Sequence, residues 1–88
     1  MSTKDKINRV TARIHEDEYV IKGNAERKHI EKVAAYVDLK MTQLTLSNRY
    51  LNPKKIAVLA AVNIADELFR LQEDYEALIK LLDEDKKV

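Results

Sequence analysis

The chain lacks cysteine and tryptophan, and its 88 residues include one glycine, one proline and one phenylalanine. Without cysteine there can be no disulfide framework and no thiolate metal site, which fits a reducing cytoplasm. With a single glycine there is no glycine-rich loop whose backbone amides would bind phosphate. These absences exclude a disulfide-stapled fold and the common nucleotide-binding loops.

An excess of one charge is also lacking. The 16 Lys and Arg residues face 15 Asp and Glu residues, which leaves a net charge of +1. A bulk electrostatic attraction to nucleic acid is therefore absent, although local basic patches remain open. No apolar run is long enough to span a bilayer, and the polar segment 1–6 lacks the apolar block of a signal peptide. We expect a cytoplasmic protein without membrane insertion.

The stretch that organises the chain runs from Asn52 to about Asp85. Asn52-Pro53 is a helix start signal, because Asn accepts bonds from free first-turn amides and Pro tolerates the first helical position. No glycine or proline follows. Apolar residues then recur at alternating steps of three and four, as in the oligomerisation seam of a coiled coil: Ala57, Ala61, Ile64, Leu68, Leu71, Tyr75, Leu78 and Leu82. Such a helix would be roughly 45 Å long, so part of its seam requires another chain.

The two halves of this helix differ in composition. Residues 56–65 are almost all apolar, which indicates burial on all sides in a globular core. From Asp66 onward the apolar positions thin to the seam and a few neighbours, as is typical of a solvated stalk. Asn63 lies in the apolar half, where a buried amide would need hydrogen-bond partners and could fix the register of an assembly. A structural role for Asn63 is favoured over direct contact with a partner.

The N-terminal part has the pattern of a β-hairpin. Residues 7–14 alternate between apolar and polar, with Val10, Ala12 and Ile14 on one face. The polar residues 15–18 predict a turn, and residues 19–21 predict a second strand. An isolated two-stranded hairpin is marginally stable in water. Its apolar face is therefore expected to lie on helices.

An amphipathic helix follows from about Ala25, with Asn24 as its expected cap. Its apolar residues share one face: Ile30, Val33, Ala34, Val37, Met41 and Leu44. In the connector, Tyr50 and Leu51 are expected to pack under the start of the long helix. The order of elements predicts an α+β fold, in which an N-terminal β-hairpin and a helix form a small head and the long C-terminal helix forms a coiled coil in an oligomer. We divide the chain into a disordered N-terminus (1–6), a globular head (7–65) and a coiled-coil stalk (66–88).

No catalytic or metal-binding constellation is evident. His15 and His29 are expected on a turn and a helix surface, and neither has a second ligand at helical spacing. Asp66 and Glu67 are adjacent, so they cannot share a proton on one helix face, and a capping or salt-bridge role is favoured over acid-base chemistry. We expect no enzymatic activity, cofactor or metal.

Basic residues fall on the outward face of the first strand, on the first helix and around the start of the long helix. The candidates for contact with an acidic partner are Arg9, Arg13, Lys40, Arg49, Lys54 and Lys55. Each is most often only a solubilising charge, but the strand and helix-start clusters could form one patch on the head.

Two segments resemble a known family. Residues 55–68, KIAVLAAVNIADEL, resemble the hallmark segment of the ZapA family of bacterial cell-division proteins, with Val62 where leucine is common. Residues 33–41, VAAYVDLKM, resemble the other recognisable stretch of that family. The resemblance covers residues 10–71, and the pairing of two stretches at this separation makes it fairly specific.

The resemblance implies a non-enzymatic protein at the midcell division septum. It would bind the tubulin-like GTPase FtsZ, crosslink or bundle FtsZ protofilaments, and so promote Z-ring assembly and stability. It also implies a homodimer, and a homotetramer formed by antiparallel pairing of coiled coils. Because the family's FtsZ contact is attributed to charged residues of the head, the six basic residues become candidate FtsZ-binding residues.

Two other functions remain open from the residues alone. A small dimeric nucleic-acid-binding regulator would place the strand arginines against phosphates, but the near-zero net charge and the absence of a recognition helix count against it. A structural subunit of an unrelated complex is the third reading.

Overall fold

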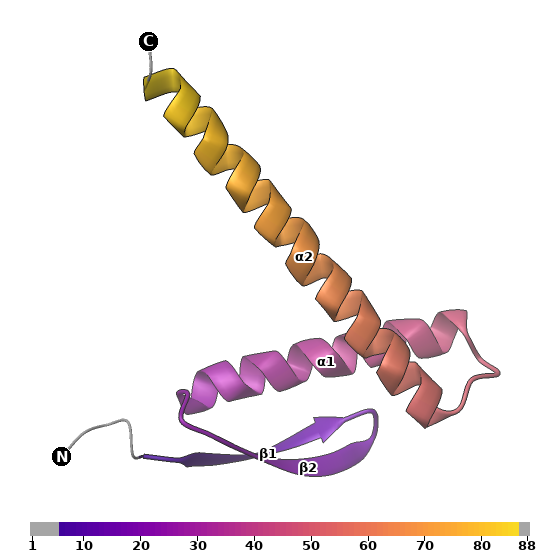
Figure 1. Ribbon diagram of the computed structural model, residues 1–88. Coiled ribbons are helices and arrows are strands. Elements are labelled where there is room, and N and C mark those ends of the chain that lie inside the picture. Colours follow the sequence, from indigo (N-terminus) through magenta and orange to yellow (C-terminus); the bar gives the residue numbers. More distant parts are fainter. Residues whose placement is uncertain (1–5, 87–88) are drawn as a thin grey trace.

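The computed structural model describes residues 6–86, and the side chains of residues 6–84. Strands β1 (Asn8–Ile14) and β2 (Asp17–Gly23) are followed by helices α1 (Arg27–Ser47) and α2 (Pro53–Lys86). Figure 1 shows the hairpin lying along one side of α1, while α2 crosses α1 and runs away from both. The predicted α+β order is confirmed. Of the predicted disordered segment 1–6, residues 1–5 lie outside the described residues.

The hairpin turn is shorter than predicted. β1 and β2 pair antiparallel from Asn8 opposite Gly23 to Ile14 opposite Asp17. The turn consists of His15 and Glu16, whose φ angles of 50° and 72° are both left-handed, as in the two-residue turns that match strand twist. The prediction of a turn over 15–18 was wrong for its last two residues, because polar side chains are accommodated at exposed strand positions.

The inner face of the hairpin packs on α1. Val10 is buried, Ala12 and Ile14 are half-buried, and the residues between them point to solvent. On α1, Ile30 and Ala34 are buried, and the side chain of Ile30 lies beside Gly23. At the open end, the Asn8 side-chain amide donates to the carbonyl of Ala25 at 2.7 Å. The predicted apolar strand face is confirmed.

The start of α1 differs from the prediction, whereas the start of α2 agrees with it. Helix α1 is capped at Glu26, not at Asn24, and the Glu26 carbonyl accepts the first helical bonds from His29 and Ile30. Glu26 contributes no side-chain cap, so this position carries none of the usual capping signal. At α2, Asn52 Oδ1 accepts a bond from the Lys55 backbone amide at 2.9 Å, as predicted.

A small core joins the two helices. Met41 of α1 and Ile56 and Ala60 of α2 are buried together, and half-buried apolar residues surround them: Ile14, Val37, Leu44 and Leu51. Leu51 packs under the long helix as predicted. Tyr50 does not, because its side chain is fully exposed.

Most of α2 has no neighbour from another element among residues 6–86. Its 34 residues span about 50 Å, and the radius of gyration is 18.0 Å, against about 12 Å for a compact domain of this length. The predicted burial of residues 56–65 on all sides does not occur in the single chain, where Val58 and Val62 are exposed. The reason is geometric, because α1 covers one side of α2 and the opposite side faces solvent.

Candidate self-association and partner-binding surfaces

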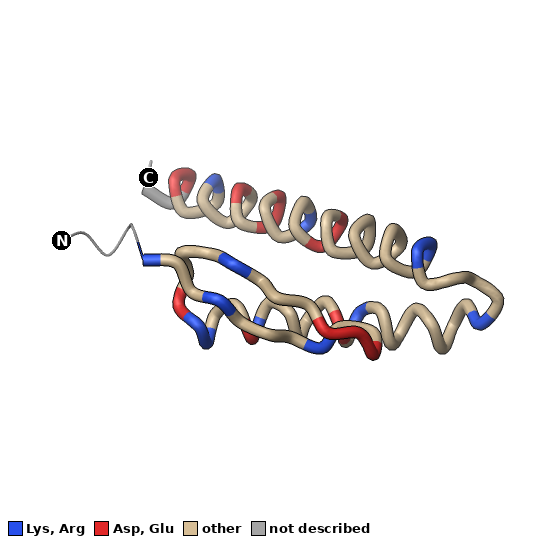
Figure 2. Tube along the Cα trace, turned by 90° about the horizontal axis from the view of Figure 1, so that it is seen from below, with Lys and Arg blue, Asp and Glu red and all other residues tan. Residues whose placement is uncertain are grey.

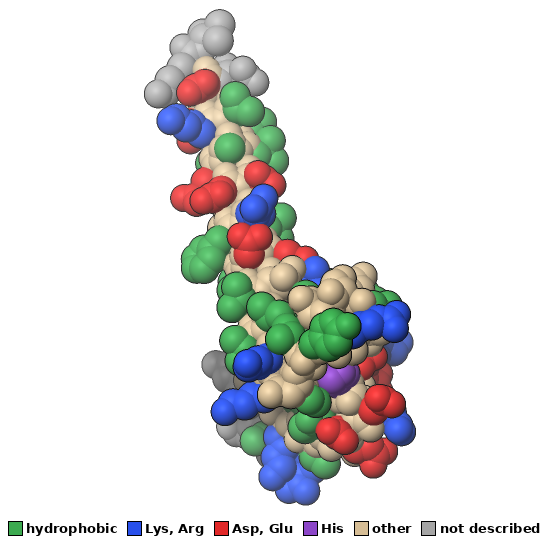
Figure 3. Space-filling model, turned by 90° about the vertical axis from the view of Figure 1, so that its right-hand side faces the viewer, with side chains coloured by type: hydrophobic (Ala, Val, Ile, Leu, Met, Phe, Trp, Pro, Cys, Tyr) green, Lys and Arg blue, Asp and Glu red, His purple; other side chains and the backbone are tan. Residues whose placement is uncertain are grey.

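The apolar face of α2 is exposed along the stalk. Leu68, Leu71, Tyr75, Leu78 and Leu82 are each more than half exposed. Figure 3 shows hydrophobic side chains continuing along the stalk beyond the head, with charged side chains beside them. Single exposed leucines are ordinary, but a continuous apolar stripe marks an interaction surface. No helix in the described part of the chain is both long and apolar enough to cross a membrane.

The upper part of this face continues onto the head. Ala57, Ala61 and Ile64 line a shallow apolar groove, in which Val37 and Met41 of α1 form the opposite wall. A second groove lies between Ile64 and a stretch of α1 that includes Val33, Tyr36 and Leu39. Those α1 residues are half exposed. Val33 was assigned to the apolar face of α1 but is not buried within the chain, whereas Tyr36 and Leu39 were missed because the sequence pattern assigned only one apolar face to this helix.

Asn63 is exposed in the single chain, next to the half-buried Ile64. Its predicted structural role would therefore concern contacts between chains. It stays a prediction.

Arg9 and Arg13 lie on the outer face of the hairpin, which we define as Arg9, Thr11, Arg13, Glu18, Val20 and Lys22. All six side chains are exposed. The strand register places Arg9 directly opposite Lys22, and Arg13 opposite Glu18. Figure 2 shows basic positions along the strands and acidic positions gathered at the turn. Lys22 was missed from the sequence, because its place opposite Arg9 depends on a register that the turn sets.

The other basic candidates lie elsewhere. Arg49 is exposed in the loop between the helices. Lys54 and Lys55 stand in the first turn of α2, where they line a hollow with the apolar side chains of Leu51 and Val58. The two clusters therefore lie on different elements, the hairpin and the loop with the first turn of α2, and their union in one patch stays a prediction.

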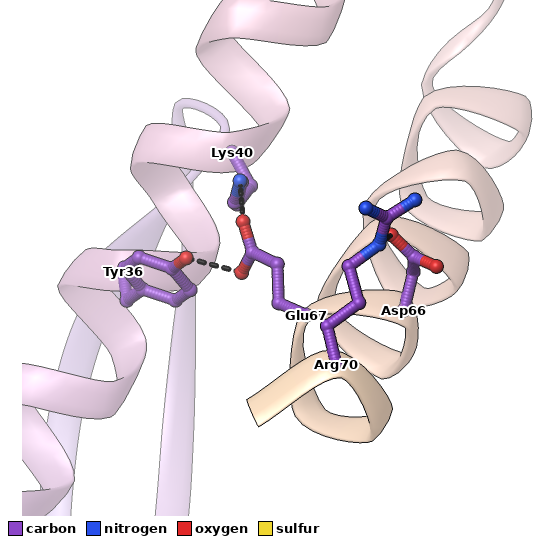
Figure 4. A network of polar contacts seen from close by, with 5 residues as sticks. All are labelled: Tyr36, Lys40, Asp66, Glu67 and Arg70. Carbon is purple, nitrogen blue, oxygen red and sulfur yellow. Dashed lines mark hydrogen bonds and ion pairs between the residues drawn. The ribbon is translucent and has the colours of Figure 1, made fainter. Parts of the chain in front are cut away.

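Lys40 is engaged within the chain. Its ammonium group forms an ion pair with Glu67 Oε2 of α2, and the Tyr36 hydroxyl donates to Glu67 Oε1. The Lys40 nitrogen also lies 5.5 Å from the centroid of the Tyr36 ring, a cation–π distance. We call these three residues the Glu67 clasp, and Figure 4 shows Tyr36 and Lys40 reaching from one helix to the carboxylate of the other.

The clasp shifts the protonation equilibria of its members. The hydrogen bond from Lys40, and then that from Tyr36, hold the pKa of Glu67 below its ordinary value. The hydrogen bond to Glu67 raises the pKa of Lys40, and the same carboxylate raises the pKa of Tyr36. All three shifts favour the state in which Glu67 is ionised while Lys40 and Tyr36 keep the protons that they donate to it. The neighbouring Asp66 pairs instead with Arg70 within α2, at 2.9 Å. Of the two roles predicted for Asp66 and Glu67, capping or salt bridging, both residues have the salt bridge.

The histidines have ordinary structural positions. His15 Nε2 lies 3.2 Å from the Thr45 hydroxyl, and His29 is exposed on α1. Within the described residues, no group of three or more His, Cys, Asp or Glu side chains is arranged to hold a metal ion.

Comparison with known proteins decides the family. The family model described as "Cell division protein ZapA" matches residues 10–87, which include the stalk. The chain belongs to the ZapA family. Among ZapA relatives, that of Geobacillus thermodenitrificans is 42% identical over 84 residues, covering 96% of this chain and 92% of the relative. That of Shouchella clausii is 40% identical over 76 residues, covering 86% and 97%.

Solved structures agree with the ZapA assignment. A structure described as a ZapA mutant dimer from Geobacillus stearothermophilus superposes with a TM-score of 0.71 at 38% identity, covering 94% of this chain and 96% of that one. A conserved bacterial protein of unknown function from Pseudomonas aeruginosa PAO1 gives a TM-score of 0.64 at 29% identity, covering 92% and 99%. The ZapA fold therefore extends over hairpin, α1 and α2.

Proposed function

We propose that this chain self-associates through the apolar face of α2 and, as an oligomer, binds FtsZ and crosslinks or bundles its protofilaments. It would thereby promote the assembly and stability of the Z-ring at the midcell septum, without catalysing a reaction. The observation that carries the proposal is the apolar stripe of α2, which extends beyond the head and is not covered by any other described element of the chain. Membership of a cell-division family supplies the biological context.

Burial of the stripe would drive the association. Leu68, Leu71, Leu78 and Leu82 would each contribute about 1.5–3 kcal/mol if fully buried, part of which offsets the entropy lost on association. The dimer described for the Geobacillus stearothermophilus relative supports a homodimer. A tetramer would follow if two stalks also paired antiparallel, with heads at opposite ends.

The contact with FtsZ is proposed at the exposed basic residues of the head. Arg9 and Arg13 would act from the outer face of the hairpin, and Arg49, Lys54 and Lys55 from the loop and the first turn of α2. Lys40 would contribute least, because its charge is already paired with Glu67. Opposite charge on the partner would favour association and fix its orientation.

Crosslinking would arise from valency. One head binding weakly to one filament subunit becomes effective when a second head on the same oligomer meets a neighbouring filament, because linkage raises the effective concentration there. The second head needs no contact with its filament beyond those that the first head makes with its own.

The test is sedimentation of purified FtsZ with GTP, with and without this protein, alongside its own mass from analytical ultracentrifugation in the same buffer. The proposal is supported if FtsZ bundles pellet together with this protein and if the protein alone sediments as a dimer or tetramer. An oligomer that leaves FtsZ in the supernatant would refute the partner while leaving self-association intact. Binding to duplex DNA that falls steeply with salt would instead favour the nucleic-acid regulator.

A further inference from the structure

One polar side chain of the stalk is partly buried at the point where α2 leaves the head. Between Ala65 and Glu84, where every side chain is described, Glu67 alone is partly buried and the others are exposed. Apolar contact between the helices is concentrated nearer the start of α2, at Ile56 and Ala60. Glu67 therefore stands where α2 leaves the head.

The geometry at Glu67 is suited to fixing a direction. Its two carboxylate oxygens are bound by two different residues, the Tyr36 hydroxyl and the Lys40 ammonium group, which are one helical turn apart on α1. A carboxylate held at both oxygens from two points along a neighbouring helix resists both rotation and tilt. The Lys40 side chain is 16% exposed and packs over the Tyr36 ring, so it is itself held in place.

We propose that Glu67, bound by Tyr36 and Lys40, is a positioning residue that sets the angle between stalk and head. The 20 residues from Glu67 to Lys86 form a lever of about 28 Å, so a swing of about 10° moves its far end by about 5 Å. This inference rests on the proposed crosslinking function, in which the angle would determine the spacing of the filaments that an oligomer holds.

The first experiment measures the angle and needs no FtsZ. Because the chain has no cysteine, spin labels can be attached at Thr11→Cys on β1 and at Glu84→Cys, an exposed position near the far end of the stalk, diluted with unlabelled chain. Glu84 lies about 25 Å along the helix from Glu67, so a swing of about 10° in Glu67→Gln should shift or broaden the label-to-label distance by up to about 4 Å. Asp66→Asn is the matched control, because it removes a neighbouring carboxylate that pairs only within α2. It should reproduce the wild-type distribution.

Two further variants separate positioning from folding. Tyr36→Phe removes one hydrogen-bond donor and keeps the ring, so it should broaden the label-to-label distance distribution less than Glu67→Gln does. The exchange Lys40→Glu with Glu67→Lys restores an ion pair of reversed polarity, and should narrow the distribution again. The inference is overturned if Glu67→Gln retains the wild-type distribution, or if the exchange fails to restore it while its helix content and oligomer mass are unchanged.

The second experiment measures the spacing between FtsZ filaments in bundles by electron cryomicroscopy. Glu67→Gln, with unchanged oligomer mass, should give a more variable spacing than wild type and Asp66→Asn. A uniform, unchanged spacing would overturn the role in crosslinking even if the labels had moved. Failure of the wild-type protein to bundle FtsZ would refute the proposed function instead, and the label distances would still decide whether Glu67 sets the angle.

Discussion

The backbone amide of His15 donates a hydrogen bond to Oδ1 of Asp38 at 2.7 Å, which ties the hairpin turn to the middle of α1. The Thr45 hydroxyl, about two helical turns further along α1, lies against the ring of the same histidine. The hairpin is thus anchored at its turn by polar contacts, and along its length by Val10 and its apolar neighbours. This anchoring fixes how the outer face is presented to a partner.

Asp38→Ala should destabilise the fold by about 1–2 kcal/mol, because it removes the acceptor of a partly buried amide. Asp38→Asn keeps an acceptor oxygen at the same place and should cost less. Denaturant unfolding would measure both, at one fixed chain concentration, since oligomer stability depends on concentration. Equal stability of Asp38→Ala and wild type would show that the contact contributes nothing.

The left-handed turn predicts a stabilising substitution. Glu16 has a φ of 72°, a conformation that glycine adopts without the strain of a side chain. Glu16→Gly should therefore raise the free energy of unfolding by up to about 1 kcal/mol. Glu18→Gly, two residues on within β2, should lower it by a similar amount. Thermal unfolding of the pair would reveal the opposite signs, and a loss of stability in both would refute the strain at Glu16.

The cross-strand pair on the outer face predicts that one substitution can raise the stability of the fold while weakening its binding to FtsZ. Arg9 and Lys22 are directly opposite, and like charges at such positions destabilise a sheet. Arg9→Glu converts the pair to opposite charges, so the free energy of unfolding should rise by up to about 1 kcal/mol. Binding to FtsZ should weaken at the same time.

Lys28→Glu is the control for that substitution, since it makes the same change of net charge at an exposed position of α1. It should leave FtsZ pelleting close to wild type. If Arg9→Glu pellets with FtsZ as well as Lys28→Glu does, the outer face of the hairpin does not contribute to binding.

The pKa shifts of the clasp predict the pH range in which it stabilises the fold. The pKa of Glu67 is lowered on folding, so its contribution is complete at neutral pH. That contribution is lost as pH falls from the ordinary value of about 4.3 through the lowered pKa. The pKa values of Tyr36 and Lys40 are raised. Their contributions are complete below their ordinary values, near 10, and are lost as pH rises through the raised ones.

The difference in unfolding free energy between wild type and Glu67→Gln should therefore be constant around neutral pH and should shrink at both extremes. Denaturant unfolding across pH would measure it, with Asp66→Asn as reference. A difference that grew on acidification would contradict the assigned direction of the Glu67 shift.

The sequence predicted those features whose signals are local. Asn52 caps α2 because its side chain bonds an amide three residues away, and β1 shows its buried face by simple alternation. The long helix follows from the absence of glycine and proline after Pro53. Each of these depends on residues within one element.

The features that were missed depend on how elements meet. Glu67 was expected to form an ion pair, but its partners lie 27 and 31 residues earlier on α1, and only the crossing of the helices brings them together. Lys22 lies opposite Arg9 because the turn has two residues, and His15-Glu16 lacks the Asn or Gly that usually announces such a turn. The cap of α1 at Glu26 carried no side-chain signal at all.

The most direct test of crosslinking by valency compares Leu71→Glu with Ala77→Glu. Both add one negative charge to exposed positions of the stalk, but only Leu71 belongs to the apolar face. Leu71→Glu should sediment as a monomer, because an unpaired charge in a helix interface opposes association, and it should form no FtsZ bundles. Ala77→Glu should remain oligomeric and bundle FtsZ. Normal bundling by Leu71→Glu, shown to be monomeric in the same buffer, would contradict the account.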